Sequence, residues 1–563
     1  MATISALATP RGALTRLALL APPLLIMFFS LAWPLANVLL RSFNEKGKAA
    51  FEGTLYLGNY LALVQDELLR QVVMQSLNLA ILSTTITILL AFPAAYIISR
   101  LSKRLSSLMM VLILMPFWVS IIVRLFAFTT ILGNEGIVNS IAGAMGVGPF
   151  PLLYNTFATV TGMVAYLLPY MILILISAMS SIDTSLLTAA RTMGASERRV
   201  FADIYFPQVK PALLGGGVIV FVLSLGFFLT PSILGGPQDI TIPVFIQQQV
   251  QVYQWGKAAS MGIVLLIASV IGYMVALRIG GKGMLSPVQQ GSRGATARDP
   301  LQLTPVTMMC LFVLCMDVIL LILPLLVVIP TSVTETTQIH FPPVGFSLKW
   351  FEEVFTSDIW MESFFKSVRV AFMTALCATV CGLALARVGT QTASRMLQTT
   401  IQVVAIAPLI VPVILLGIGI YDVQSRTGLI GTDMGLVIAH TILCMPLTFL
   451  VLGNAISRVD ISLEQAAWTM GAGNARAFFS IVIPGVFTAI LGSLIISFVT
   501  SWDEAVLAMF QTDIDKTLPV TIYSYLKSGI TPAVSAVATI VTLPVLLIAA
   551  YIAIKAVTGA RRI

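Results

Sequence analysis

Long apolar stretches separated by short polar segments run along the whole 563-residue chain. A helix that crosses a lipid bilayer needs about 20 mostly apolar residues. By that measure the pattern predicts twelve membrane-spanning helices, at residues 17–40, 76–99, 107–132, 155–179, 212–234, 258–279, 306–330, 364–387, 398–420, 434–455, 487–510 and 532–556. Arg11 and Arg16 precede the first stretch, as in a signal peptide. Its apolar run is too long for a signal core, however, and no small-residue cleavage site follows, so we expect a retained span.

A polar segment at residues 280–305 separates the sixth predicted span from the seventh. It is rich in Gly, Ser, Pro, Arg and Gln and has no apolar periodicity, which predicts a flexible linker. The linker divides the chain into two six-span halves, residues 1–279 and 306–563. Because six is an even number, we expect the two halves to have the same orientation, as parallel repeats.

The composition agrees with a polytopic all-α membrane protein. Hydrophobic residues make up 58% of the chain and charged residues 10%, and the mean hydropathy is +0.97, whereas a soluble domain carries about 25% charged residues. With a cytoplasmic N-terminus, the cytoplasmic segments hold 20 Lys and Arg but six Asp and Glu, and the opposite side holds 10 and 17, with Lys366, Asp503 and Glu504 counted on that side although they fall within the span bounds. This is the positive-inside pattern, which predicts that both termini lie in the cytoplasm. The net charge of +8 therefore reflects topology and does not indicate nucleic-acid binding.

The cysteines and histidines predict no redox, metal or catalytic site. Five cysteines fall inside apolar runs of the second half, with no CxxC pair and no nearby histidine, and we expect them to be small buried side chains. They are Cys310, Cys315, Cys377, Cys381 and Cys444. His340 and His440 are isolated in the sequence and are expected to be surface or packed residues. No convergent set of His, Asp and Ser residues suggests a membrane-embedded enzyme.

Residues 183–215 and 460–492 repeat one another without gaps at an offset of 277, and 17 of the 33 positions are identical. Each copy lies between the fourth and fifth predicted spans of its half and contains Ala-Ala-x-Thr-Met-Gly-Ala, with the glycine at Gly194 or Gly471. Both copies are fairly polar in a very apolar chain and lie on the predicted cytoplasmic side. We therefore expect them to serve a partner outside the membrane, and their equal placement favours a fusion of two related subunits.

Each copy predicts two short helices joined by a turn. Asp183 and Asp460 suit a helix start, because their side chains can accept hydrogen bonds from free backbone N–H groups. The glycine then breaks the helix, and a second amphipathic helix is expected to end at Pro207 or Pro484, before the fifth span of the half. Two such helices parallel to the membrane would form a knob for a soluble partner. The alternative is a helix that rests on lipid headgroups.

Both copies resemble the EAA loop of ABC-importer permeases, whose pattern is roughly Glu-Ala-Ala, three residues, Gly-Ala, and then spaced Phe, Ile and Pro. In that family the loop forms a coupling helix that docks into a groove of the ATPase subunit. Thr188 and Gln465 stand at the position of the family Glu, and Glu464 comes directly before Gln465. This departure affects any salt bridge that the family Glu would make, but docking of the loops is still expected. The resemblance implies loops at 183–211 and 460–488 and these docking residues: Ala189, Ala190, Gly194, Ala195, Arg199, Ala466, Ala467, Gly471, Ala472 and Arg476.

The resemblance covers nearly the whole chain. MPFWVSIIVRLFAFTTILGNEGIVN (115–139), SLGFFLTPSILGG (224–236), FPPVGFSLKWFEEVF (341–355) and SWDEAVLAMF (501–510) are similar to the spermidine/putrescine branch, with a PotB-type first half and a PotC-type second half. It implies the type I importer permease fold in a bacterial inner membrane. The sequence holds no GxxxxGK[ST] phosphate loop. The expected partners are therefore two copies of a cytoplasmic ATPase, which bind ATP and Mg, and a periplasmic or extracellular substrate-binding protein.

Ionisable groups inside predicted spans are candidates for function, because burial of charge in a bilayer is costly. Asp503 and Glu504 lie in the eleventh span, which lines the pathway in the family, and could favour passage of a cationic amine; the alternative is a hydrated position near the outer interface. Asp317 is expected to be a helix-packing partner rather than a substrate ligand. Arg124 and Arg369 could pair with buried carboxylates or extend to an interface.

Several aromatic residues could make cation–π contacts with an ammonium group, although packing or interfacial anchoring explains each one singly. They are Phe117, Trp118, Tyr166, Tyr170 and Trp502. We thus expect an importer permease, not an enzyme, for a polyamine-like amine. An opine, an aminoalkylphosphonate or another small anion is the alternative cargo. An ion-coupled secondary transporter is the rival class, but it would have coupling carboxylates in several spans and no paired loops.

Overall fold

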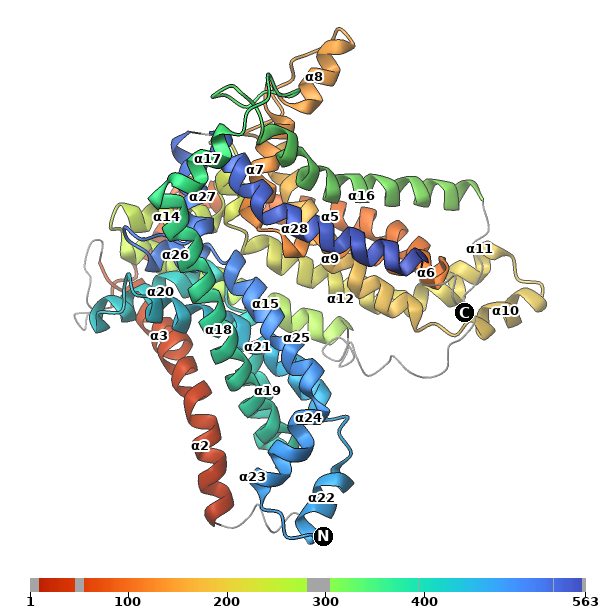
Figure 1. Ribbon diagram of the computed structural model, residues 1–563, viewed down its shortest axis with the longest axis vertical. Coiled ribbons are helices and arrows are strands. Elements are labelled where there is room, and N and C mark those ends of the chain that lie inside the picture. The colour runs from red at the N-terminus through yellow and green to blue at the C-terminus, as the bar shows by residue number, and fades with distance from the viewer. Residues whose placement is uncertain (1–9, 46–54, 281–303, 393, 530, 559–563) are drawn as a thin grey trace. The chain divides into compact units, whose positions relative to one another are not determined.

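A computed structural model of the chain describes residues 10–45, 55–280, 304–392, 394–529 and 531–558. All the regular structure in these ranges is helical (Figure 1). Ten helices are long and apolar enough to cross a membrane, and two further helix pairs, bent by 96° and 72°, raise the number within the described ranges to twelve. The prediction of an all-α polytopic protein with about twelve spans is therefore confirmed. Most of the linker predicted at 280–305 lies outside the described residues.

The described residues form two compact units that do not coincide with the two halves of the sequence. Unit 1 comprises Met1–Tyr56, Gln254–Leu266 and Ile359–Thr521, and unit 2 comprises Leu57–Tyr253, Ile267–Asp358 and Ile522–Ile563. The first span of each half thus belongs to the unit that holds the four middle spans of the other half.

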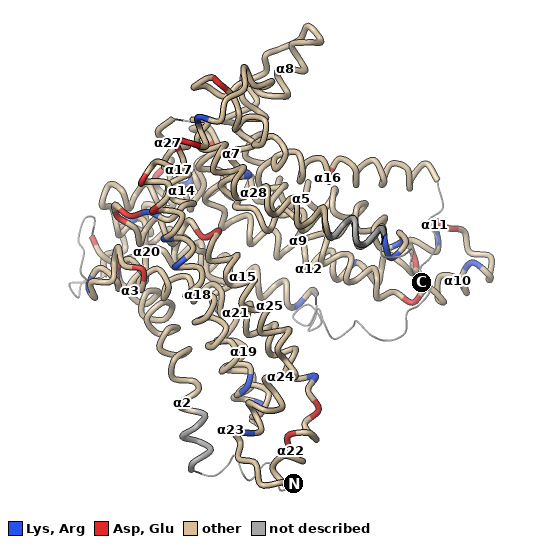
Figure 2. The backbone as a smooth tube through the Cα atoms, viewed as in Figure 1, with Lys and Arg blue, Asp and Glu red and all other residues tan. Residues whose placement is uncertain are grey.

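Unit 2 is built around three mutually packed helices, α5 (Glu67–Arg100), α9 (Thr156–Ser180) and α12 (Phe206–Leu225). α16 (Pro305–Thr331), the first span of the second half, packs along α5, and α28 (Pro532–Thr558) packs on α16. Residues from all these helices except α28 share one apolar core, and α9 carries no charged residue along its 25 positions (Figure 2). The other helices wholly in unit 2 are α4 (Gly58–Gln65), α6 (Lys103–Leu114), η2 (Met115–Trp118), α7 (Ile121–Leu132), α8 (Ile137–Ala144), α10 (Thr184–Thr192), α11 (Glu197–Arg199), η3 (Val200–Tyr205), α13 (Leu229–Leu234), α14 (Ile242–Gln251) and α17 (Lys349–Thr356).

Unit 1 holds α18 (Asp358–Gln391), α21 (Asp433–Ile456) and α25 (Phe487–Asp503). α18 and α21 approach closely at Gly382, where an added Cβ would lie 2.1 Å from Thr448 Oγ1, and Thr448 Oγ1 donates a hydrogen bond of 2.9 Å to the Ala378 carbonyl. Small residues permit such approaches between membrane helices. The other helices wholly in unit 1 are α2 (Pro10–Met27), η1 (Phe28–Ala32), α3 (Trp33–Ser42), α19 (Arg395–Ile406), η5 (Ala407–Leu409), α20 (Val413–Thr427), α22 (Ile461–Thr469), α23 (Asn474–Ala477), η6 (Phe478–Val482), α24 (Ile483–Gly485) and α26 (Val506–Gln511). α15 (Trp255–Gly280) and α27 (Leu518–Ser528) contribute to both units.

α3, the end of the first span of the chain, packs against α20 of the second half. Arg41 of α3 forms an ion pair with Asp422 of α20, and both side chains are largely buried. The Arg41 guanidinium also lies 5.1 Å from the centre of the Trp255 ring, which stacks on Tyr421 at 5.7 Å. Arg41, at the end of the first span of the first half, therefore has its ion-pair partner in the second half.

Four predicted spans are broken, contrary to the continuous helices expected at 107–132, 212–234, 398–420 and 487–510. The backbone leaves the helix at Val119, Gly226, Pro412 and Glu504. Because of the break at Val119, the third stretch that is long and apolar enough to cross a membrane begins at Ile121 and runs to Ala144. Apolar residues continue through the first three breaks, so hydropathy did not reveal them, whereas the charged pair Asp503 and Glu504 lies at the fourth.

The cysteines differ in part from the expectation of burial. Cys310, Cys381 and Cys444 are buried, but Cys315 and Cys377 are exposed, so the prediction is wrong for these two. They lie on outward faces of α16 and α18. Such faces are as apolar as the core in a membrane protein, and sequence composition does not distinguish them.

Candidate functional site

The first repeat loop (residues 183–205) begins with a capped helix and a glycine turn. Asp183 Oδ1 accepts a hydrogen bond of 2.9 Å from the Ser185 N–H at the start of α10. After α10, Gly194 has φ +85°, in the left-handed region that favours glycine. The Ala195 N–H then donates to the Ala190 carbonyl at 3.0 Å, which closes the end of the helix.

The second repeat loop (residues 460–482) has the same local geometry. Asp460 Oδ1 accepts from the Ser462 N–H at 2.9 Å, Gly471 has φ +86°, and the Ala472 N–H donates to the Ala467 carbonyl at 2.9 Å. A Cβ added at Gly471, as at Gly194, would meet no atom within 4 Å. Glycine is therefore required here by backbone conformation and not by lack of space. The predicted helix start and glycine turn are confirmed in both copies.

The carboxyl groups that cap the two loops share one electrostatic property. Hydrogen bonds from the backbone and side chain of Ser185 hold the pKa of Asp183 below its ordinary value. Ser462 has the same effect on the pKa of Asp460. Both caps thus carry negative charge at neutral pH, close to the first backbone N–H groups of their helices.

The tip of each loop is exposed. Met193 is 88% exposed and Met470 is 81% exposed, each directly before its glycine. Of the ten residues predicted to dock a partner, six are exposed: Ala189, Gly194, Arg199, Ala466, Gly471 and Arg476. Ala190, Ala195 and Ala472 are half-buried and Ala467 is buried. The two adjacent alanines of each copy thus divide between an outer and an inner face of the helix, most clearly in the second copy.

The two loops differ in how they join the next span. In the first, α11, η3 and α12 form one continuous stretch from Glu197 to Leu225, so the predicted end at Pro207 is wrong. The wider π-helical turn η3 ends two residues before Pro207 and relieves the clash that a proline ring causes in a regular helix, and η6 ends at the same distance from Pro484 in the second loop. In the second, the helix ends at Gly485 and turns by 72° before α25, close to the predicted end at Pro484.

The pathway candidates in unit 2 form an aromatic cluster. The hydroxyl groups of Tyr166 and Tyr170 lie 3.3 Å apart, and the ring centre of Phe117 lies 4.7 Å from that of Tyr170. The buried Arg124 lies 5.5 Å from the centre of the Tyr166 ring, so this ring already has a cation as its neighbour. Trp118 is 45% exposed at the end of η2.

The pathway candidates in unit 1 lie where α25 ends. Trp502 packs between Phe364 and Phe498, with ring centres 5.6 Å and 6.2 Å away. Asp503 is the last residue of α25, and Glu504 Oε1 accepts from the Leu507 N–H at 2.9 Å. Glu504 therefore caps the short helix α26. The corresponding break in the first half, after Leu225, has no carboxylate.

Two further charged residues of the predicted spans differ in environment. Asp317 on α16 is 1% exposed, and neither carboxylate oxygen has a hydrogen-bond partner within the described residues. Arg369 donates from Nε to Asp433 Oδ2 at 3.1 Å, but its side chain is 60% exposed and that of Asp433 is 33% exposed, so the partner is not the buried carboxylate that was predicted. His440 is buried with Nδ1 2.8 Å from Ser501 Oγ, in agreement with a packed histidine.

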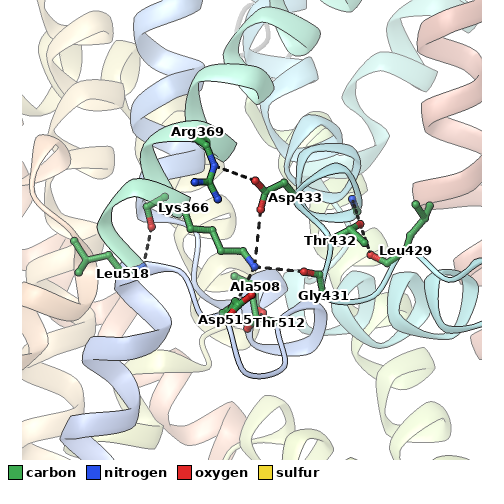
Figure 3. Close-up of polar contacts among 12 residues, drawn as sticks. Lys366, Arg369, Leu429, Gly431, Thr432, Asp433, Ala508, Thr512, Asp515 and Leu518 are labelled. Atoms are coloured by element: carbon green, nitrogen blue, oxygen red, sulfur yellow. Dashed lines mark hydrogen bonds and ion pairs between the residues drawn. The ribbon is translucent and has the colours of Figure 1, made fainter. Parts of the chain in front are cut away.

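A polar junction that the sequence reasoning missed fastens α18 to the start of α27 (Figure 3). The nearly buried Lys366 donates from Nζ to the Asp515 carbonyl at 2.9 Å and to the Gly431 carbonyl at 3.4 Å, and lies 3.9 Å from Asp433 Oδ1. The neighbouring Ser367 Oγ accepts from the Leu518 N–H at 2.8 Å.

The first half has a counterpart of this junction on α5, with a neutral glutamine at the position of the lysine. Gln75 Nε2 donates to Asp239 Oδ1 at 3.1 Å, and Ser76 Oγ accepts from the Ile242 N–H at 2.7 Å. Thr156 Oγ1 donates to the same Asp239 oxygen at 2.6 Å. The two junctions could have been found from a second short repeat in the sequence, DITIPV at 239–244 and DKTLPV at 515–520.

Comparisons with known proteins agree with a duplicated membrane protein of one family. The family model described as "Binding-protein-dependent transport system inner membrane component" matches residues 85–328 and again residues 378–559. The spermidine/putrescine transport system permease protein PotB of Haemophilus influenzae is 29% identical over 251 residues, which cover 44% of this chain and 87% of that protein. PotC of the same organism is 30% identical over 207 residues, covering 35% of this chain and 76% of its own length. A solved bacterial ABC transporter involved in the import of alginate aligns with 48% of this chain and 97% of its own, at 19% identity and a TM-score of 0.40.

Proposed function

Because the chain belongs to the family of binding-protein-dependent transport system inner membrane components, we propose that it forms the complete membrane pathway of an ABC importer in one polypeptide. Two family domains that are separate subunits in many importers would here be joined by the segment at 280–305. The chain is a transport component, and the chemistry of ATP would belong to another subunit.

The observation that carries this proposal is the pair of repeat loops with identical local geometry. Each presents a capped helix, a left-handed glycine and an exposed methionine at its tip. Two copies of one ATPase would dock on these two loops through the exposed residues near Gly194 and Gly471. In this proposal both loops and both termini face the cytoplasm, as the distribution of Lys and Arg favours.

The transport cycle then follows from two states of the permease, one facing outward and one facing inward, which differ in their affinity for the ATPase and for the binding protein. A closed ATPase pair with ATP and Mg bound would hold the loops together and favour the state that opens outward, where a binding protein releases its cargo. Hydrolysis would return the pathway to the inward-facing state. The permease is the element with two states, and both partners shift its equilibrium.

The proposed cargo is a polyamine-like amine, because the similar PotB and PotC proteins are spermidine/putrescine permeases. Asp503 and Glu504 would attract a cationic substrate at the break after α25. An opine, an aminoalkylphosphonate or another small anion is the alternative. A thermal-shift screen of the partner binding protein separates the two, because a protein that binds only anions without an amine would refute the polyamine proposal.

Co-purification and uptake test the permease role. The full chain, expressed with the genes of its transport system, is expected to retain an ATPase through purification and to support ATP-dependent spermidine uptake in proteoliposomes. The double substitution Gly194→Val and Gly471→Val should abolish both, because valine does not tolerate the positive φ at these turns.

Gly473→Ala is the matched control, since this glycine lies in the second loop with φ −71° and free space around it. Retention of ATP-dependent uptake by the double variant would refute the docking role of the loops. Uptake that follows an ion gradient and does not require ATP would instead indicate a secondary transporter.

A further inference from the structure

The second repeat loop is fastened to α18 by a buried ion pair. Glu464 on α22 is 5% exposed and Arg387 on α18 is 7% exposed. Arg387 donates from Nη1 to Glu464 Oε1 at 2.8 Å and from Nη2 to Glu464 Oε2 at 2.5 Å. This two-bond geometry fixes both the distance and the orientation of the carboxylate.

The same guanidinium also contacts the other arm of the loop. Its central carbon lies 5.0 Å from the ring centre of Phe478, the first residue of η6. Arg387 therefore joins three segments at once: α18, the helix before Gly471 and the helix after it.

The first repeat loop has apolar contacts at the equivalent place, and one turn further along α5 Arg100 donates one hydrogen bond of 3.3 Å from Nη1 to the hydroxyl of Tyr205 in η3. The Arg100 guanidinium also lies over the rings of Tyr96 and Tyr205, at 3.8 Å and 4.7 Å from their centres. The repeat places Leu187 at the position of Glu464 and Phe201 at that of Phe478, and α5 and α18, both 34 residues long, place Tyr96 at that of Arg387. Leu187 is 2% exposed within the core of unit 2, and the rings of Tyr96 and Phe201 are 6.1 Å apart. Apolar contacts of this kind have no fixed direction and permit small rotations.

The other end of α18 is fastened as well, at Lys366 and Ser367. These residues bond to the segment that follows the break at Glu504, at the Asp515 carbonyl and the Leu518 N–H. At a rise of about 1.5 Å per residue, the helix between Lys366 and Arg387 is roughly 30 Å long, the thickness of the hydrocarbon core. α18 has no internal proline, whereas α5 contains Pro93 between its own two attachment points, Ser76 and Tyr96.

We infer that Arg387 is a positioning residue that makes α18 a rigid connection between the second repeat loop and the segment 512–518, and that the two loops therefore transmit movement unequally. The inference rests on the proposed docking of an ATPase to the loops. Movement imposed on the second loop reaches the segment beyond Glu504 through fixed polar contacts at both ends of one helix that has no internal proline. In the first half the corresponding route has apolar contacts and a single hydrogen bond of 3.3 Å to a neutral hydroxyl at the loop end, in place of a buried two-bond ion pair, and a proline within the helix.

The test uses the full chain with its ATPase and binding protein in proteoliposomes, and measures spermidine taken up per ATP hydrolysed. Arg387→Met and Glu464→Gln are expected to lower this ratio at least tenfold while the ATPase still co-purifies. The double variant Arg387→Tyr with Glu464→Leu, which reproduces the side chains of the first half, should fold stably and still have a low ratio. The control is Arg426→Ala on α20, an arginine that also pairs with a carboxylate, that of Asp422 at 3.4 Å, but whose side chain is 54% exposed and lies outside both loops, and it should leave the ratio unchanged.

A second readout is independent of the cargo. Spin labels at the exposed Phe479 and Ile514, in a background without the exposed Cys315 and Cys377, report the distance between the loop and the segment beyond the break. This distance is expected to stay the same with and without ATP, and its distribution should broaden in Arg387→Met.

Each result decides between the proposals. A wild-type chain that neither retains an ATPase nor shows ATP-dependent uptake refutes the proposed function. A wild-type chain that does both, together with an unchanged ratio and distance in the Arg387 variants, refutes the positioning role alone. If the single variants fail to assemble, the double variant decides, because a wild-type ratio in it would mean that the ion pair contributes only to stability.

Discussion

Replacement of Lys366 measures how strongly the junction between α18 and α27 is held. The ammonium is largely buried and donates to two backbone carbonyls, those of Asp515 and Gly431. A hydrogen bond from a charged group contributes about 1.5–3 kcal/mol, and the longer second bond is the weaker of the two, so we expect Lys366→Met to lower the free energy of unfolding by about 3 kcal/mol. Asp433 keeps Arg369 as its partner, so the substitution leaves no carboxylate without a cation.

The structure offers a graded variant and a matched control for this prediction. Lys366→Gln introduces the residue that the first half has at Gln75 and keeps one neutral donor, so the expected loss is about 1–2 kcal/mol. Lys349 also donates to a backbone carbonyl, that of Glu335, but from an exposed side chain. Lys349→Met should therefore change stability by about 0.5 kcal/mol or less.

Unfolding of the full chain in mixed detergent micelles, followed by tryptophan fluorescence, provides the measurement. Equal destabilisation by Lys366→Met and Lys349→Met would contradict this prediction, because burial would then have no influence on the strength of these bonds.

Three further predictions concern packing, capping and symmetry. Gly382→Val should destabilise unit 1 by about 1–3 kcal/mol or more, because its Cβ would overlap Thr448 Oγ1, whereas Gly389→Ala has its nearest neighbour at 3.5 Å and should be tolerated; thermal unfolding compares the two, and equal midpoints would contradict the close approach. Glu504→Gln keeps an acceptor for the Leu507 N–H but removes the charge, so it should lower spermidine uptake without changing stability, while Glu504→Ala should lower both; normal uptake by Glu504→Gln would rule out attraction of the cargo by this carboxylate. Ser76→Ala and Ser367→Ala each leave a backbone N–H at a helix start without its acceptor and should cost about 1–3 kcal/mol each. Hydrogen exchange at Ile242 and Leu518 should accelerate to a similar degree, and protection that persists in either variant would show that its serine is dispensable.

The features that the sequence predicted well are local ones. Spans such as those around α9 and α21 follow from the length of their apolar runs, and the turns at Gly194 and Gly471 follow from a glycine placed directly after a capped helix. The two family matches confirm the predicted type I permease fold with two related halves. These features depend on neighbours within a few residues along the chain, where sequence patterns are informative.

The features that were missed depend on contacts between distant residues or on backbone breaks inside apolar runs. Leu225 and Phe228 are both apolar, so nothing in hydropathy marks the end of α12 between them. Arg387 is the last residue of the span predicted at 364–387, and only the fold brings Glu464, 77 residues later, to its guanidinium. The short repeat that contains Asp239 and Asp515 was the one overlooked signal, since it marks the helix starts that Ser76 and Ser367 hold.

The packing of α3 on α20 has a consequence for how the protein is made. Arg41 enters the membrane early in synthesis, but Asp422, its ion-pair partner, is 381 residues further along the chain. At about 5–20 residues per second, the ribosome needs roughly 20–80 s to reach it. During that interval the first span lies in the bilayer with a cation whose partner has not yet been synthesised. Release of a nascent chain before Asp422 would thus leave α3 without its place in unit 1, and a quality-control protease could recognise incomplete molecules by their loosely held first span.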